Sequence, residues 1–125
     1  MPARVMDASV LGAIIFDEPR AAEAYTLIRG FELNAPGLLA YELTHIAQKK
    51  SRAYPAQREA IEKALEAALL MHIQWSEVDH VEVLRLALET GLTTYDASYL
   101  YLARSLGLVL VTFDERLQAV VDAKG

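Results

Sequence analysis

Short apolar runs alternate with longer amphipathic stretches along this chain, a pattern typical of strands that alternate with helices. The clearest strand signals are residues 4–6 near the start and Leu108 to Val111 near the end. Because the second run is apolar throughout, it predicts a strand buried on both faces of a parallel sheet. Residues 31–35 and 73–75 are weaker strand candidates. We therefore expect up to four short strands.

Helical periodicity fills the segments between these runs. Pro19 is placed to open the second helix and Gly30 to end it, while Gly91 and Gly107 are placed to end later helices. The expected helices cover about 9–16, 19–30, 38–53 (ended by Tyr54-Pro55), 56–71, 79–90 and 94–106. This order predicts an α/β fold with a central parallel sheet, helices on both faces, and ligands beyond the carboxyl ends of the strands. The chain has no repeat or linker, so residues 1–125 are expected to form a single domain.

The composition limits the chemistry that the chain can perform. There is no Cys, so a metal site would use oxygen or imidazole ligands. The run from Val10 to Phe16 is too short to cross a bilayer, so we expect no signal peptide, no membrane span and a cytoplasmic location. The formal net charge of −5 disfavours a nucleic-acid partner by itself. If several of these acids bind divalent ions, the cleft around them becomes locally neutral or positive. The net charge therefore does not decide the function.

Two carboxylates lie where helices ordinarily carry apolar side chains. Glu42 is one turn from Ile46, and Asp96 is one turn from Leu92 and Leu100, so each acid shares the apolar face of its helix. Neither face offers a Lys or Arg at a matching position. Because a carboxylate turned toward the core is costly unless a cation meets it, this placement predicts a divalent metal.

Two further acids follow the clearest strands. Asp7 and Asp114 each stand at the carboxyl end of a predicted strand, where each could also act as the N-cap of the next helix. Capping and metal binding are compatible. With Glu42 and Asp96 they make four oxygen ligands of the kind that Mg²⁺ or Mn²⁺ prefers. Such a set suits phosphodiester hydrolysis by a metal-activated water.

Four segments together resemble a known family: Val-Met-Asp7-Ala-Ser, Tyr-Glu42-Leu, Thr-Tyr-Asp96-Ala-Ser-Tyr-Leu-Tyr-Leu-Ala and Leu-Val-Thr112-Phe-Asp114-Glu-Arg-Leu. They are similar to PIN-domain ribonucleases, particularly the VapC toxins of type II toxin–antitoxin pairs. The resemblance covers nearly the whole chain, and the last two segments are its most specific part.

The resemblance implies a three-layer PIN-like fold and an Mg²⁺- or Mn²⁺-dependent endoribonuclease that acts on RNA. It also implies a homodimer and a cognate VapB-like antitoxin whose tail blocks the cleft. Matched position by position, the catalytic and metal-binding acids are Asp7, Glu42, Asp96 and Asp114.

Three polar residues are candidates for supporting roles. Thr112 matches the hydroxyl that supports the last strand end in the family, although such hydroxyls often bond only backbone. Ser9 is close enough in sequence to reach the site, and His45 replaces an Asn of many relatives. We expect His45 to be a partly buried polar neighbour whose charge can change near neutral pH. The basic stretch 49–52 is either a solvated helix end or a contact to RNA. The tyrosines expected mainly to pack are Tyr95, Tyr99 and Tyr101.

Two other functions remain open from the sequence. The chain could be a non-catalytic PIN-like scaffold or interaction module whose acids hold a structural ion, or a structure-specific nuclease acting on DNA. A phospho-acceptor receiver domain also has acids at strand ends, but the chain lacks a suitable Lys at the end of its last strand.

Overall fold

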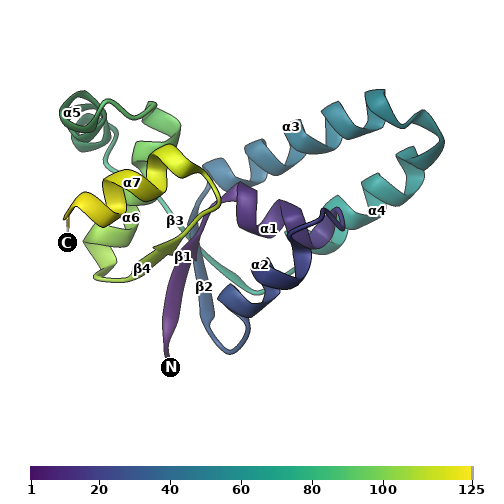
Figure 1. Ribbon diagram of the computed structural model, residues 1–125, viewed down its shortest axis with the longest axis horizontal. Helices are drawn as coiled ribbons and strands as arrows, with labels where there is room; N and C mark the ends of the chain where they lie inside the picture. Colours follow the sequence, from purple (N-terminus) through teal and green to yellow (C-terminus); the bar gives the residue numbers. More distant parts are fainter. Residues whose placement is uncertain (125) are drawn as a thin grey trace.

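Four parallel strands form the centre of the computed structural model, which describes residues 1–124 (Figure 1). The strands lie in the order β3-β2-β1-β4. Their bounds are β1 Ala3–Met6, β2 Glu32–Pro36, β3 Ile73–Ser76 and β4 Val109–Val111. All four strands expected from the sequence are therefore present, and β1 is a central strand.

Helices make every connection between strands, as a parallel sheet requires. They are α1 Ala8–Ile15, α2 Ala21–Ile28, α3 Leu38–Ala53, the 3₁₀ helix η1 Pro55–Gln57, α4 Arg58–Leu69, α5 His80–Thr90 and α6 Thr94–Leu106. The helix α7 Glu115–Lys124 follows the last strand. Gly91 and Gly107 end α5 and α6 in the left-handed conformation, as expected.

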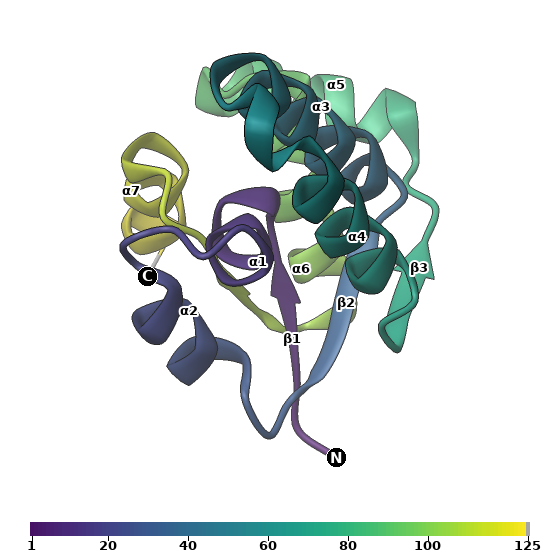
Figure 2. The same cartoon turned by 90° about the vertical axis from the view of Figure 1, so that its right-hand side faces the viewer.

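The helices cover both faces of the sheet. The chain first moves outward from β1 to β2 to β3 and then returns to place β4 on the other side of β1. Crossover connections between parallel strands are nearly always right-handed. The connection from β3 back to β4 runs across the sheet in the opposite direction, so it lies on the opposite face. Figure 2 shows α1 and α6 on opposite sides of the sheet, and α6 contacts β1, β2 and β4. The predicted three-layer α/β architecture is confirmed.

Successive strands are added on one side of β1 and then, with β4, on its other side, and ligands of open α/β sheets bind at such a switch point in the strand order. Met6 pairs with Val111, and the amide of Asp7 donates to the carbonyl of Val111 at 3.3 Å. Asp7 and Thr112 are therefore the first residues beyond the paired part of two adjacent strands.

Two details differ from the sequence prediction. β4 is an edge strand, and its first residue Val109 is exposed, so the strand is not buried on both faces along its length. The helix expected over 56–71 is a short 3₁₀ turn followed by α4. Within residues 1–124, no helix combines the length and hydropathy needed to cross a bilayer.

Candidate active site

Asp7 is buried at the carboxyl end of β1, where it caps α1. Its Oδ1 accepts hydrogen bonds from the amides of Ser9 (3.1 Å) and Val10 (3.3 Å) and from the Ser9 hydroxyl (2.6 Å). Its Oδ2 accepts a hydrogen bond from the hydroxyl of Thr112. Burial raises the pKa of the Asp7 carboxyl, and these hydrogen bonds oppose the rise. The predicted N-cap is confirmed, and it holds the carboxylate in one orientation.

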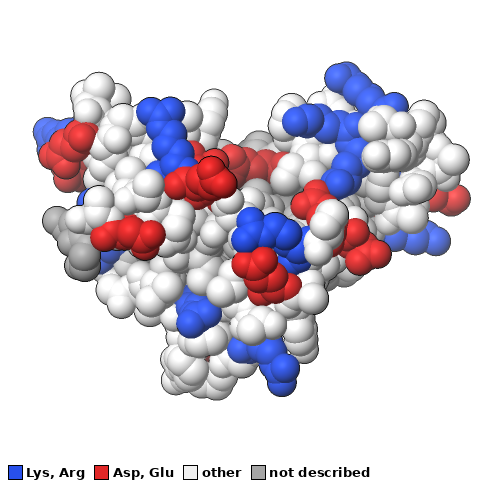
Figure 3. Space-filling view, viewed as in Figure 1, with Lys and Arg blue, Asp and Glu red and all other residues white. Residues whose placement is uncertain are grey.

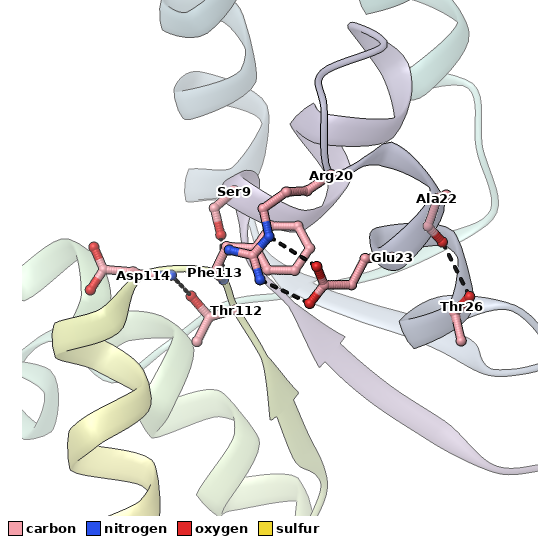
Figure 4. A network of polar contacts seen from close by, with 8 residues as sticks. All are labelled: Ser9, Arg20, Ala22, Glu23, Thr26, Thr112, Phe113 and Asp114. Carbon is pink, nitrogen blue, oxygen red and sulfur yellow. Dashed lines mark hydrogen bonds and ion pairs between the residues drawn. The ribbon is translucent and has the colours of Figure 1, made fainter.

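The hydroxyls of Ser9 and Thr112 join the turn after β1 to the turn after β4 (Figure 4). Ser9 Oγ accepts from the amide of Phe113 at 2.9 Å, and Thr112 Oγ1 accepts from the amide of Asp114 at 3.0 Å. Each hydroxyl also donates to Asp7. Two of the three supporting candidates named from the sequence, Ser9 and Thr112, therefore touch Asp7 directly.

Asp114 lies at the exposed rim of the same edge. Its Oδ1 accepts from the amide of Leu117 at 2.8 Å, so it caps the first turn of α7. Beside it, the guanidinium of Arg20 stacks on the ring of Phe113 at 3.7 Å from the centroid and pairs with Glu23 at 2.8 Å (Figure 4). These contacts attach α2 to the turn that carries Asp114.

Glu42 approaches this edge from α3 and meets a residue of α6. Its Oε1 accepts a 2.6 Å hydrogen bond from the phenol of Tyr99, which is fully buried. Burial and the charge of Glu42 raise the pKa of the Tyr99 phenol, so it stays protonated and donates. Packing was expected for Tyr99, but its contact with Glu42 was not. The available signal was its position one turn after Asp96 on the same face of the helix.

The four acids influence one another electrostatically. Burial raises the pKa of the Glu42 carboxyl most, and the charges of Asp7 and Asp96 raise it further. Burial likewise raises the pKa of Asp96, followed by the charges of Asp114 and Asp7, while Arg116 opposes the rise. Figure 3 shows acidic side chains in the notch between the part of the molecule that carries α3 and the part that carries α6 and α7. The elements thus bring negative oxygens to one region.

These oxygens do not yet converge on a single point. Among the described residues 1–124, no three acidic or histidine side chains have the spacing of a ready-made metal site. Three of the four acids are instead engaged in hydrogen bonds within the protein: Asp7 and Asp114 cap helices, and Glu42 accepts from Tyr99. The donor set nevertheless fits Mg²⁺ or Mn²⁺, because these ions prefer oxygen and keep several waters. A cation would also relieve the repulsion that raises the carboxyl pKa values.

The PIN domain family matches residues 4–123 of the chain, nearly its full length. The chain belongs to the PIN domain family. The fold described above and the four motif segments of the sequence therefore agree with an independent comparison.

Two curated PIN-domain relatives come from Pyrobaculum aerophilum. Exonuclease VapC9 is 42% identical over 82 residues, which cover 66% of this chain and 62% of that protein, less than two thirds of its length. Ribonuclease VapC3 is 31% identical over 118 residues, which cover 90% of each chain.

Two solved structures share the fold. PAE2754 from Pyrobaculum aerophilum has a TM-score of 0.78 and 34% identity, covering 94% of this chain and 84% of its own. VapC20 from Mycobacterium tuberculosis, described as a sarcin–ricin loop cleaving toxin, has a TM-score of 0.66 and 16% identity, with 94% and 95% coverage. At that identity the second likeness shows the fold alone.

Two sequence-based expectations about side chains of this PIN domain are wrong. His45 is exposed, not partly buried, although it lines a hollow with Glu42 and its charge lowers the pKa of that carboxyl. Tyr95 does not pack in the core, because 61% of its surface is exposed.

In the basic stretch, Lys50 pairs with Glu18 at 2.9 Å and so attaches α3 to the turn after α1.

Proposed function

We propose that this protein is a metal-dependent endoribonuclease that hydrolyses RNA phosphodiester bonds. The observation that carries the proposal is the placement of four acids from separate parts of the chain near the switch point between β1 and β4: Asp7, Glu42, Asp96 and Asp114. Relatives named as a ribonuclease and an exonuclease support the same reaction class.

The chain's own side chains would prepare the site before substrate arrives. Ser9 and Thr112 donate hydrogen bonds to both oxygens of Asp7, so they would hold this carboxylate in one orientation while it binds an ion. Asp96 and Asp114 are more accessible and would hold the same Mg²⁺ or Mn²⁺ from the rim. When bound, such an ion lowers the pKa of water and stabilises negative charge on the reacting phosphate.

Glu42 has a separate task in this proposal. Its Oε1 is held by Tyr99, and its other oxygen is left to complete the metal-binding set or to accept a hydrogen bond from the attacking water. The reaction needs no nucleophilic side chain, because water attacks the phosphorus. The role of Tyr99 is to position Glu42, and it does not touch the reacting atoms.

We further propose that the chain acts as the toxin of a type II pair, with a VapB-like antitoxin that blocks the cleft. The names of the VapC relatives support this assignment. A homodimer is part of the same proposal. It is supported by exposed apolar side chains along one side of α5, which a second copy would cover: Val81, Leu84 and Leu88.

The deciding experiment is cleavage of labelled single-stranded RNA by the purified protein with Mg²⁺, with Mn²⁺ and with EDTA. We expect cleavage with either metal and none with EDTA. A protein that cleaves nothing under any of these conditions would be a scaffold or interaction module. Competition between labelled RNA and labelled DNA tests the substrate, and preferential cleavage of DNA would replace the ribonuclease proposal with a DNA nuclease.

A further inference from the structure

Each acid that a helix brings to the site is preceded by a tyrosine that faces solvent. Tyr41 precedes Glu42 and is 78% exposed, and Tyr95 precedes Asp96 and is 61% exposed. Consecutive residues of a helix point about 100° apart. The acids therefore face the notch, while the two tyrosines face the surface immediately beside it.

Both tyrosines line two adjacent hollows. The smaller one also contains Glu42 and His45, so one acid of the proposed site forms part of its wall. The larger one has a volume of about 870 Å³ and lies where β2 and β3 end and where α3 and α6 begin. Leu38 borders both hollows as well. The larger hollow is thus continuous with the proposed site.

The larger hollow is aromatic and carries little charge. Trp75, 41% exposed, adds a third ring to those of Tyr41 and Tyr95. In the described part of the chain, its lining includes no Lys or Arg, and its only titratable groups besides the tyrosines are Glu77 and His80. Besides the tyrosine phenols, its hydroxyl groups, which can bond the edge of a ligand, come from Ser76, Thr94 and Ser98.

We propose that this aromatic hollow binds an unpaired nucleobase of the RNA, next to the phosphate that lies at the acids. This inference rests on the proposed nuclease function. A site without basic side chains and with an acid in its wall is unsuited to a phosphate group, which would be repelled. A flat uncharged base is suited to it, because bases of single-stranded RNA stack on aromatic side chains and bond polar groups through their edges.

The position of the hollow beside the acids also favours unpaired RNA over duplex RNA. Bases of a duplex are stacked on their neighbours and paired, so they cannot enter a side pocket without leaving the helix. A base beside the scissile phosphate can enter only when that nucleotide is unpaired. The hollow therefore favours single-stranded or looped RNA over a continuous duplex.

The single tryptophan of the chain allows a direct test, because Trp75 lines the hollow. We would titrate the protein with a single-stranded RNA hexamer in Ca²⁺ buffer and follow Trp75 fluorescence. The same hexamer backbone without bases is the matched ligand control. We expect quenching by the hexamer and none by the abasic backbone. Equal quenching by both would overturn the proposal, because it would mean that the backbone alone is bound.

Substitutions then test the tyrosines. Tyr41→Leu and Tyr95→Leu should each weaken hexamer binding about tenfold, since they remove one stacking surface. Tyr95→Phe keeps the ring and should bind like the original protein. The surface control is Tyr25→Leu, because Tyr25 is 55% exposed on α2 and outside both hollows. Unchanged affinity in both leucine variants would overturn the proposal.

The remaining outcomes separate this inference from the proposed function. Base-dependent quenching without any RNA cleavage would support the hollow and refute the nuclease. RNA cleavage by the original protein together with unchanged hexamer affinity in both leucine variants would refute the nucleobase site and leave the nuclease proposal standing. If Trp75 emission instead changes with protein concentration and Tyr95→Leu dissociates a dimer, a second copy occupies the hollow and the nucleobase proposal is wrong.

Discussion

The phenol of Tyr99 donates a 2.6 Å hydrogen bond to Oε1 of Glu42 and so joins α6 to α3. Tyr99 is fully buried, whereas Glu42 is half-buried at the edge of the notch. The ring of Tyr99 therefore belongs to the core, and its hydroxyl reaches Glu42 of the proposed site. Stability and carboxylate position depend on the same side chain.

Tyr99→Phe should keep the fold and lose this hydrogen bond. Because Glu42 would keep its burial with one donor fewer, we expect a loss of about 1–2 kcal/mol in the free energy of unfolding. The pKa of Glu42 should rise further, since the phenol lowers it at present. The measurements are urea unfolding and the pH profile of RNA cleavage. A profile with an unchanged acid limb would contradict the positioning role.

Thr112→Val should disturb Asp7 more than its small change of shape suggests. The hydroxyl donates to Asp7 and accepts from the amide of Asp114, so the substitution breaks two contacts at once. We expect a destabilisation of about 1–3 kcal/mol and reduced cleavage, because a buried carboxylate loses a donor. Thr112→Ser, which keeps the hydroxyl, is the matched control. Equal effects of valine, which lacks the hydroxyl, and serine, which keeps it, would contradict the role of the hydroxyl.

Asp96→Ala should abolish cleavage while leaving the metal-free fold intact or more stable. The substitution removes a carboxylate whose pKa is raised by burial and by the charges of Asp114 and Asp7. We expect activity to fall at least about a hundredfold. Thermal unfolding and RNA cleavage are measured together. The control is Glu66→Gln on the exposed side of α4, which also removes one negative charge. Unfolding of Asp96→Ala would contradict a catalytic assignment.

The metal-free protein should lose stability as the pH rises through the acidic range. Asp7, Glu42 and Asp96 have ordinary pKa values of 3.8, 4.5 and 3.8, and all three are raised in the folded state. The folded protein therefore binds these protons more tightly than the unfolded chain does. The three carboxyls therefore begin to lower the free energy of unfolding near their ordinary pKa values. This loss is complete at pH values above their raised pKa values in the folded state.

The measurement is the melting temperature between about pH 4 and pH 8 in EDTA, repeated with Mg²⁺. We expect Mg²⁺ to raise the melting temperature most at the upper end of this range, where all three acids are ionised. Asp96→Asn should show a weaker pH dependence in EDTA, because one of the three groups is gone. The prediction fails if wild type and variant have parallel profiles with and without the metal.

The elements of the fold could be predicted from the sequence because local rules determine their ends. Asp79 and Thr93 cap α5 and α6 with their side chains, and Gly91 and Gly107 end these helices. Such signals depend on a few neighbouring residues, so a single sequence contains them. The exposure of Val109 cannot be predicted from such local signals. Its apolar run predicts burial, but only the strand order reveals that β4 lies at an edge.

The acids proposed for the candidate site, and the Ser9 and Thr112 partners of Asp7, could be named in advance, whereas the Tyr99 partner of Glu42 could not. Asp7 and Asp114 follow strands, and each of these positions can be read from apolar patterning. The bond between Tyr99 and Glu42 joins residues 57 positions apart, so it depends on how α6 packs against α3. The exposure of His45 and Tyr95 likewise depends on which neighbours cover each helix, and periodicity does not contain that information.

The pairing of Met6 with Val111 has a consequence for how this protein can change in length during evolution. One inserted or deleted residue in β4 would exchange the side chain opposite Asp7 and turn Thr112 to the other face of the sheet. The turn between α3 and α4 lies far from this edge and can lengthen without such an effect (Figure 1). Insertions among homologues should therefore collect at that distal turn and be absent between Val109 and Asp114.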